Sequence, residues 1–281
     1  MIVIAESGST KTHWVIVDNG KELKTFNSLG INPYTQKPAE IEAIIEIEVA
    51  LPLAAYNIEA LYFYGASCSS EDNCNIVRNA IAKFSHIQNI YVEHDVMAAA
   101  LGLFGRESGI ACILGTGSNS CFFDGTSLYQ EVPALGYILG DEGSGASLGK
   151  RLLRDYLYLN LPKHLEHQLK LQFNLNKELV LNKVYKEQAP NRWLASFAPF
   201  IKANIHEKYC EDIVRESFRD FFRYHICCFD NYKQLPIGVV GSIGFFFYNI
   251  LEEVSIEFET HLKKVIQTPL EGLIAHHTYN I

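Results

Sequence analysis

Short apolar runs separated by turn-forming residues dominate the start of the chain. Residues 2–5, 14–17 and 22–26 have strand length, and Asp18-Asn19-Gly20 between the last two is typical of a tight hairpin. The first connection, residues 7–10, is rich in serine, glycine and threonine. The pattern therefore predicts a three-stranded antiparallel meander.

After residue 30 the pattern alternates between helix and strand. Apolar positions three or four residues apart predict a helix over 41–49 that ends near Pro52. The next expected elements are a strand at 61–64, a helix at 76–84 capped by Asp72 or Asn73, a strand at 90–92 and a helix at 96–104. The first part of the chain is thus predicted to be of βββαβαβα type.

The second part repeats this order. Strands are expected at 110–114, 120–123 and 128–132, with a turn of glycine, threonine, serine and asparagine at 115–119. The later elements expected are a largely helical region at 145–232, a strand at 237–240, a helix at 245–257, a strand at 262–266 and a helix from Pro269. The echo indicates a duplicated α/β unit. We predict two domains, residues 1–107 and 108–281.

Composition excludes several classes of protein. The net charge of −8 argues against a nucleic-acid binder, and no stretch approaches the roughly 20 apolar residues of a membrane span. Residues 1–5 lack the basic flank of a secretory signal. Seven cysteines, with Cys227 and Cys228 adjacent, do not suit a disulfide framework. We expect a cytoplasmic protein.

The two small-residue turns are the candidate chemical features. Glycine lets the backbone approach a phosphate, and N–H groups with serine and threonine hydroxyls supply donors. A single such turn commonly does no more than join two strands. Two of them, each after the first strand of a duplicated unit, predict a pair of phosphate-binding turns. Neither fits the phosphate loop ending in Gly-Lys-Ser/Thr or the Gly-x-Gly-x-x-Gly pattern.

Asp95 and Asn32 are polar residues at element ends. Asp95 follows a strand and begins a helix, so its carboxylate could accept a proton from an alcohol or could cap the helix. Asn32 precedes Pro33, and its amide could bind two hydroxyls or only shape a turn. The residues alone leave both choices open.

Taken together, four segments give a specific resemblance. The chain resembles the BadF/BadG/BcrA/BcrD ATPase-like family, which includes N-acetylglucosamine kinases and belongs to the superfamily of acetate and sugar kinases, Hsp70 and actin. The segments are Glu6-Ser7-Gly8-Ser9-Thr10-Lys11-Thr12, Leu114-Gly115-Thr116-Gly117-Ser118-Asn119, Gly140-Asp141-Glu142-Gly143-Ser144-Gly145 and Val239-Val240-Gly241-Ser242. The resemblance implies an α/β fold of two ribonuclease H-like (actin-like ATPase) domains, with a cleft between them and a helical insertion in the second.

The resemblance also implies roles for individual residues. Asp95 would be the catalytic base facing the sugar hydroxyl, and Glu6 would hold Mg²⁺ through water. The ATP contacts would come from Ser7, Gly8, Ser9, Thr10, Lys11, Gly115, Thr116 and Gly117 at the phosphates and from Gly241 and Ser242 beside the adenosine. Besides Asp95, the sugar contacts would be Asn32, Ser118, Asn119, Gly136, Asp141, Glu142 and Gly145.

The expected activity is ATP- and Mg²⁺-dependent phosphorylation of the 6-hydroxyl of N-acetylglucosamine or a related amino sugar. Leu135-Gly136-Tyr137 replaces the family's usual tryptophan and Gly-His, and His13 replaces an acid, so the sugar's identity stays open. A non-catalytic sensor of sugar or nucleotide is the alternative. A dehydratase-activating ATPase ranks low, because it needs cysteines that hold an iron–sulfur cluster. The sequence also leaves open whether the chain forms a homodimer.

Overall fold

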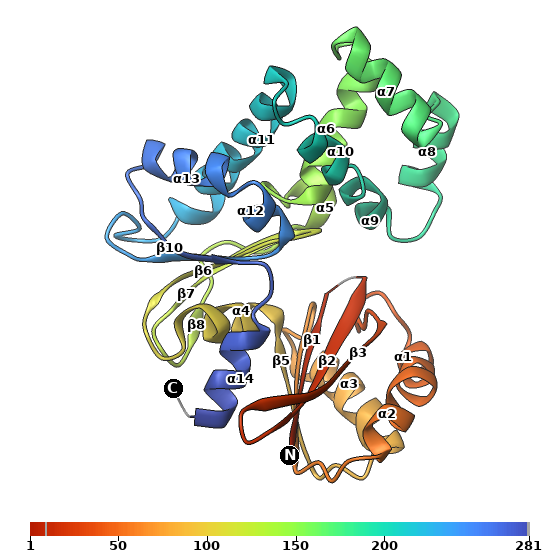
Figure 1. Cartoon of the computed structure of the whole chain (residues 1–281), viewed down its shortest axis with the longest axis vertical. Coiled ribbons are helices and arrows are strands. Elements are labelled where there is room, and N and C mark those ends of the chain that lie inside the picture. The colour runs from red at the N-terminus through yellow and green to blue at the C-terminus, as the bar shows by residue number, and fades with distance from the viewer. Residues whose placement is uncertain (9, 280–281) are drawn as a thin grey trace. The chain divides into compact units, whose positions relative to one another are not determined.

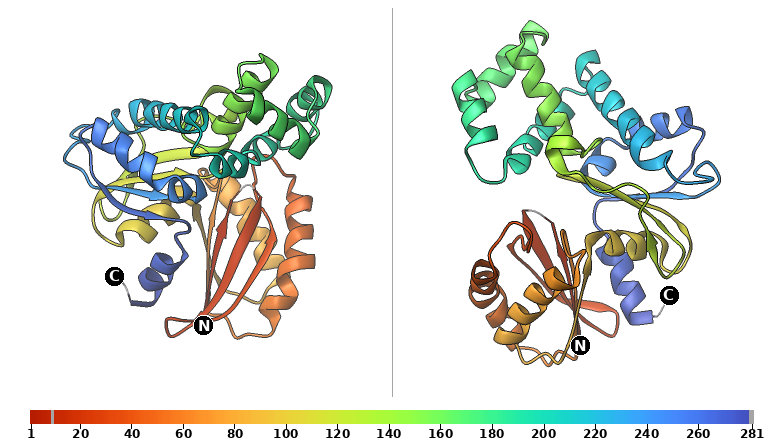
Figure 2. Two further views of the ribbon diagram at one scale, coloured as in Figure 1. Left: turned by 45° about the horizontal axis from the view of Figure 1, so that its top comes forward. Right: turned by 180° about the vertical axis from the view of Figure 1, so that it is seen from behind.

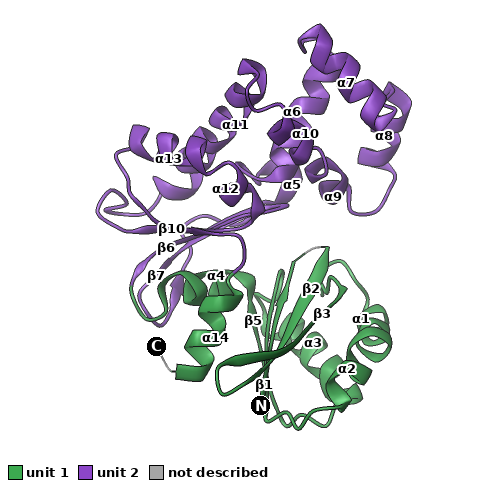
Figure 3. Cartoon of the chain, in the orientation of Figure 1, with its two compact units in different colours: residues 1–107, 269–281 green, residues 108–268 purple. Residues whose placement is uncertain are grey.

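The computed structural model describes residues 1–8 and 10–279 and divides the chain into two compact units (Figures 1 and 3). Unit 1 comprises Met1–Glu107 and Pro269–Ile281, and unit 2 comprises Ser108–Thr268. Each unit has its own five-stranded sheet with helices. The predicted α/β class with two related units is confirmed.

The helices and strands of unit 1 follow the predicted order. They are β1 (Ile2–Ser7), β2 (Lys11–Asp18), β3 (Lys21–Leu29), α1 (Pro38–Ile44), the π-helix η1 (Ile45–Val49), α2 (Ala50–Ala54), β4 (Ala60–Gly65), α3 (Glu71–Phe84), β5 (Asn89–His94), α4 (Asp95–Phe104) and, from the end of the chain, α14 (Leu270–Tyr279).

Parallel pairing in the first sheet brings three strand ends to one edge. The strand order is β3-β2-β1-β4-β5, with β1, β2 and β3 antiparallel and β1, β4 and β5 parallel. Ser7 pairs with Gly65, and Gly65 pairs with His94. Residues that follow these three positions therefore lie at the carboxyl edge of the sheet, where ligands bind in open α/β sheets.

Alternation along β1 distributes its side chains between two cores. Val3 and Ala5 pack with residues of α1 and α3, whereas Ile4 packs with Ala98 of α4 and Leu273 of α14. Figure 2 shows helices on both faces of this sheet. Glu6 has the parity of Ile4 and so belongs to the face covered by α4 and α14.

The helix α14 departs from the predicted domain limits. The prediction assigned residues 108–281 to the second domain, but the last segment belongs to unit 1. There, a Cβ on Gly272 would overlap the backbone of Gly102 in α4, and one on Gly102 would lie 2.6 Å from the Cβ of Pro269. Two glycines thus let α14 pack directly on the backbone of α4.

Unit 2 has the same sheet with a long helical insertion between its third and fourth strands. Its elements are β6 (Gly109–Leu114), β7 (Ser118–Phe123), β8 (Leu128–Tyr129), α5 (Gly136–Leu139), α6 (Gly145–Leu157), α7 (Lys163–Phe173), α8 (Lys177–Tyr185), α9 (Pro190–Ala195), α10 (Ala198–Ala203), α11 (Lys208–Phe221), the π-helix η2 (Phe222–Ile226), β9 (Ile237–Val240), α12 (Ser242–Phe246), α13 (Tyr248–Glu257) and β10 (Leu262–Ile266).

The second sheet has strand order β10-β9-β6-β7-β8. Its antiparallel strands β6, β7 and β8 and its parallel strands β6, β9 and β10 match those of unit 1 position by position. The shared order supports the predicted duplication. β8 is shorter than the predicted 128–132, and β7 begins at Ser118, so Ser118 and Asn119 belong to a strand instead of the turn.

Two predicted helix limits, at α3 and at α12, were wrong for local reasons. The cap of α3 is Ser70, whose Oγ accepts a hydrogen bond from the N–H of Asn73 at 3.3 Å. The helical run expected to end near Pro52 passes from α1 through η1 into α2 and ends at Ala54, close to the predicted limit. The helix expected at 245–257 is divided into α12 and α13 at Phe247.

Candidate active site

The first turn is anchored by two buried hydroxyls. Ser7 and Thr12 are fully buried, and their hydroxyls lie 2.7 Å apart. The Ser7 Oγ also accepts a hydrogen bond from the N–H of Ile31 at 3.0 Å and donates to the Ile31 carbonyl at 3.1 Å. The Ser7 side chain therefore fastens the turn to the segment after β3.

Gly30 is a residue of this site that the sequence reasoning missed. Its N–H donates to the Thr10 carbonyl at 3.1 Å, and a Cβ on Gly30 would lie 2.6 Å from the carbonyl oxygen of Gly8. The N–H of Gly8 donates to the Lys11 carbonyl at 3.1 Å. Gly30 therefore supports the backbone of the turn on one side, while Thr10 and Lys11 are exposed. Ser9 lies outside the described residues.

Two carboxylates lie near the carboxyl edge of the same sheet. Glu6 is the second-last residue of β1, and Asp95 is the first residue of α4, directly after β5. His94 holds the N-cap position of α4, so Asp95 lies inside the helix. Asp95 Oδ1 is 3.4 Å from Nδ1 of His94 and accepts no hydrogen bond from any described residue.

Burial and mutual repulsion perturb both acids. Burial raises the pKa of Glu6 to about 7, with a further increase from Asp95 and an opposing effect of Lys11. Burial also raises the pKa of Asp95, opposed by His94 and by the N–H of Val96. Two neighbouring carboxylates resist ionising together, whereas a bound cation would favour the ionised form of both.

The pKa of Glu6 predicts a specific dependence of stability on pH. Because folding raises this pKa from 4.5 to about 7, the folded chain holds a proton that the unfolded chain releases, so stability falls as pH rises through that interval. In metal-free buffer, Glu6→Gln should therefore be more stable than the wild type at pH 8, by up to about 3 kcal/mol, and should show no such gain at pH 4.5.

Urea unfolding with a chelator at the two pH values measures this difference. The matched control is Glu46→Gln, which removes an exposed carboxylate of unit 1 and should show no pH-dependent gain. An equal gain for Glu6→Gln at both pH values would contradict the assigned origin of the shift.

The second turn rests on the start of α6. The N–H of Gly115 donates to the Gly117 carbonyl at 3.0 Å, the N–H of Gly145 donates to the Gly115 carbonyl at 2.9 Å, and the N–H of Ala146 donates to the Thr116 carbonyl at 3.0 Å. Ser144 caps α6, with its Oγ accepting from the N–H of Ser147 at 3.1 Å. The helix start predicted near Ser144 is confirmed.

Gly241 brings a third segment against this turn. It has a φ of 125°, and a Cβ there would overlap the carbonyl of Leu114, the last residue of β6. Its own carbonyl accepts the N–H of Phe245 at 3.0 Å, and Ser242 begins α12. The close approach needs glycine, and it places Gly241 and Ser242 at the same sheet edge as the second turn.

Asp141 and Glu142 are adjacent but have different partners. Asp141 Oδ1 accepts the N–H of Ser118 at 3.3 Å, and burial raises the pKa of the Asp141 carboxyl, with a smaller opposing effect from that hydrogen bond. Glu142 Oε2 lies 3.0 Å from Nε2 of His225. His225 was missed, because no sequence motif links it to a residue 83 positions away.

Some of the residues predicted to contact the sugar already form hydrogen bonds within the protein, and others do not. Asn32 Oδ1 accepts the N–H of Tyr34 at 3.0 Å, and Asn119 Oδ1 accepts the N–H of Ser120 at 2.9 Å. The Ser118 hydroxyl is buried and has no partner among the described residues. Gly136 begins α5 with a φ of 71°, and no atom of the described part of the chain lies within 4 Å of a Cβ placed there.

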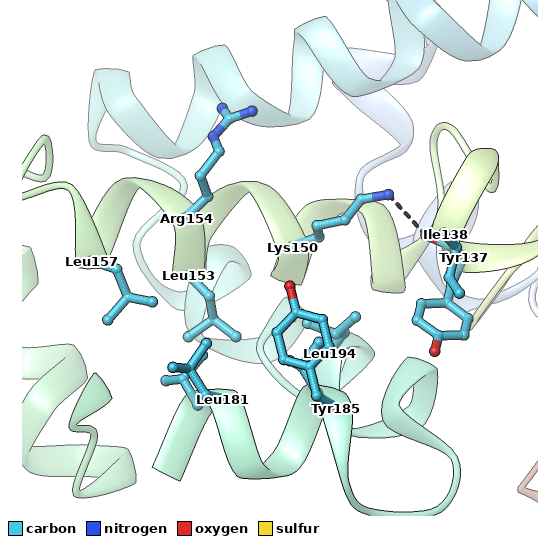
Figure 4. Close-up of a pocket in the computed structure, with 11 residues that line it drawn as sticks. Tyr137, Ile138, Lys150, Leu153, Arg154, Leu157, Leu181, Tyr185 and Leu194 are labelled. Carbon is cyan, nitrogen blue, oxygen red and sulfur yellow. Dashed lines mark hydrogen bonds between the residues drawn. The ribbon is translucent and has the colours of Figure 1, made fainter. Parts of the chain in front are cut away.

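Unit 2 also contains an apolar groove of about 320 Å³ between α5, α6, α8 and α9 (Figure 4). Leu153 and Leu157 of α6 point into it towards Leu181 and Tyr185 of α8. None of the residues predicted to bind ATP or sugar lines it. The groove is therefore separate from the candidate site.

The structure gathers the predicted residues into one set in each unit. Unit 1 brings Glu6, the first turn and Asp95 to one sheet edge, and unit 2 brings the second turn, Asp141 and Gly241 to the matching edge.

Among residues 1–8 and 10–279, no group of three or more histidine, cysteine, aspartate or glutamate side chains could hold a metal ion. All seven cysteines are free thiols. No described helix is long and apolar enough to cross a membrane.

Comparisons with known proteins agree with this architecture. A scan against protein-family models and a search of the curated proteins both give no match. Among solved structures, a "putative N-acetylglucosamine kinase" from Porphyromonas gingivalis is 39% identical, with a TM-score of 0.95 over 100% of this chain and 99% of that chain.

Two more distant structures share the fold alone. A "putative N-acetylglucosamine kinase" from Chromobacterium violaceum is 18% identical, with a TM-score of 0.64 over 97% of each chain. A ROK family glucokinase from Streptomyces griseus, solved with glucose and AMPPNP, is 16% identical, with a TM-score of 0.56 over 97% of this chain and 96% of that chain. With 39% identity along its whole length, the chain belongs to the same family as the Porphyromonas gingivalis protein.

Proposed function

We propose that this protein is an ATP-dependent sugar kinase that phosphorylates the 6-hydroxyl of N-acetylglucosamine or a closely related amino sugar. The 39% full-length identity to the Porphyromonas gingivalis protein is the observation that carries the proposal. It also agrees with the BadF/BadG-type resemblance of the sequence. A kinase using ATP is proposed to act in the cytoplasm.

The glycine turns are proposed to bind the phosphates of ATP. In unit 1, Thr10 would supply a hydroxyl and Lys11 a positive charge, and in unit 2 Thr116 would supply a hydroxyl. Gly8, Gly115 and Gly117 would let the phosphates approach the turn backbone, since the N–H groups of Gly8 and Gly115 already donate within their own turns. Ser7 would act through the turn it fastens, because its hydroxyl is buried. Gly241 and Ser242 would lie beside the adenosine.

Asp95 is proposed as the general base. Its side chain retains 23% exposure, through which a sugar hydroxyl could reach the carboxylate, and its buried Oδ1 has no hydrogen-bond partner among the described residues. Glu6 and Asp95 suit Mg²⁺, which binds through one or two carboxylates while keeping several waters. When bound, Mg²⁺ would neutralise the charge that develops on the phosphates. Glu6 would hold this ion through water, and its carboxylate would lose its proton.

Sugar contacts are proposed within each unit by itself. In unit 1, Asn32 has its Oδ1 engaged by Tyr34, which leaves its Nδ2 able to donate to a sugar hydroxyl. In unit 2, the proposed contacts are Ser118, Asn119, Gly136, Asp141, Glu142 and, through its backbone, Gly145. The predicted cleft that would bring these residues to one sugar stays a prediction.

ADP release in the presence of Mg²⁺ tests the function directly. We expect ADP release with N-acetylglucosamine above that with N-acetylmannosamine, glucosamine or glucose, and phosphorus NMR should place the new phosphate on the 6-hydroxyl. Sugar binding in calorimetry without ADP release would instead support the non-catalytic sensor. Equal ATP hydrolysis with and without every sugar would contradict a kinase.

A further inference from the structure

A row of three residues on one helix supports the loop that carries Asp141 and Glu142. Ser217 and Phe221 lie on α11, and His225 lies on the π-helix η2 that continues it. The Ser217 Oγ accepts the N–H of Gly143 at 3.2 Å, and a Cβ on Gly143 would lie 2.9 Å from the Cβ of Phe221. With Nε2 of His225 at 3.0 Å from Glu142 Oε2, each member of this supporting row contacts the loop.

His225 is itself held in place from several directions. Its side chain is 8% exposed, and its ring stacks on Phe221 with centroids 5.0 Å apart and an angle of 20° between the planes. Its carbonyl accepts the Ser120 hydroxyl at 2.8 Å. A π-helical hydrogen bond from the N–H of Cys227 to the Phe222 carbonyl, 2.9 Å long, spans the turn that contains it. Single π-helical turns occur often at functional sites.

The loop conformation separates two adjacent acids. Asp141 has a φ of 60°, which is rare for a residue with a side chain, and its carboxylate turns back to the N–H of Ser118. Glu142 turns to His225 instead and retains 24% exposure. One acid therefore stabilises the start of β7, directly after the second turn, while the other keeps accessible surface and a fixed orientation.

We propose that His225 is a positioning residue that orients the Glu142 carboxylate towards a sugar hydroxyl. This inference rests on the proposed function. A free glutamate side chain loses rotamer freedom when it binds a ligand, and a partner that fixes it beforehand reduces that cost. The ring nitrogen is bonded to one carboxylate oxygen, Oε2, so the other oxygen is the proposed acceptor for the sugar.

Two substitutions of His225 separate positioning from packing. His225→Phe keeps a ring against Phe221 but removes the hydrogen bond, whereas His225→Gln retains a donor near the position of Nε2. We expect His225→Phe to raise the KM for N-acetylglucosamine by roughly 10- to 100-fold with little change in the KM for ATP, since hydrogen bonds to charged groups contribute on this scale. His225→Gln should recover most of the loss.

Tyr224→Phe is the matched control, because it removes an exposed hydroxyl from the same π-helical turn. It should leave both KM values unchanged. The thermal midpoint of each variant shows whether the fold survives. In a Glu142→Gln background, His225→Phe should add little, because the oriented carboxylate is already absent.

The inference and the proposed function fail in different ways. Wild-type protein without sugar-dependent ADP release overturns the function. An active wild type whose sugar KM is unchanged in a folded His225→Phe variant overturns the inference alone. The inference also falls if His225→Phe raises the sugar KM by the same factor with and without Glu142→Gln. If His225→Phe does not fold, His225→Gln takes its place and should have a smaller KM for the sugar than Glu142→Gln. If the KM of folded His225→Gln is as large as that of Glu142→Gln, the inference is overturned.

Discussion

Asp95→Asn is expected to lower kcat for sugar phosphorylation by about 10³-fold, the middle of the range for loss of a general base. Asparagine retains the shape of aspartate but cannot accept the proton of the sugar hydroxyl. The fold should survive, because the Asp95 Oδ1 makes no hydrogen bond to the described residues that the change would remove. Rapid-quench kinetics and a thermal melt measure the two effects.

Glu93→Gln is the matched control for this change. It removes a negative charge from an exposed side chain on β5, two residues before Asp95. Its kcat should stay within a few-fold of the wild type. Carbon-13 NMR of Glu6 gives a second readout, because removing the charge of Asp95 should lower the pKa of Glu6 below about 7. A kcat near the wild-type value for Asp95→Asn would refute the assignment of the base.

The local part of the fold could be predicted because each element carries its own signal. Asp18-Asn19-Gly20 forms the turn between β2 and β3, with Asn19 and Gly20 both at positive φ. β10 has the bounds predicted for it, 262–266. Turn residues and apolar periodicity act over a few positions, so the sequence alone is enough to recognise them.

Apart from the helix boundaries, the errors arise where segments distant in the sequence meet. The position of α14 depends on its contact with Gly102, which lies far earlier in the chain, and no periodicity in α14 reveals that partner. For the same reason, the sequence did not reveal the roles of Gly30 and His225. Gly30 lies among turn-forming residues, and His225 lies within a long helical region, so neither carries a local signal of its contact with the Gly8 carbonyl or with Glu142.

Both glycine turns were predicted from composition, and the structure adds what holds them in place. The first rests on Gly30 and on the buried Ser7 hydroxyl, and the second rests on the start of α6 and on Gly241. Each turn follows the first strand of an equivalent sheet. The two units thus share the strand order and the position of the turn. The contacts that support the turn differ between them.

Gly8→Ala separates a phosphate-binding turn from a merely connecting one. Among the described residues, a Cβ on Gly8 would meet nothing closer than the Lys11 carbonyl at 3.9 Å, so they leave room for it. The thermal midpoint should therefore stay within a few degrees of the wild type, since a surface change of this kind costs about 0.5 kcal/mol or less. If ATP phosphates approach the backbone here, the added methyl group occupies their space, and kcat/KM for ATP should fall by about 10²-fold.

Gly30→Ala provides the contrasting variant, in the segment after β3 that supports this turn. Its Cβ would lie 2.6 Å from the Gly8 carbonyl oxygen, so the turn must shift even without ATP. This variant should lose both stability and activity, whereas Gly8→Ala should lose activity alone. Unfolding followed by circular dichroism and initial rates at varied ATP concentration compare the two. An unchanged kcat/KM for ATP in Gly8→Ala would show that the phosphates do not lie against this turn.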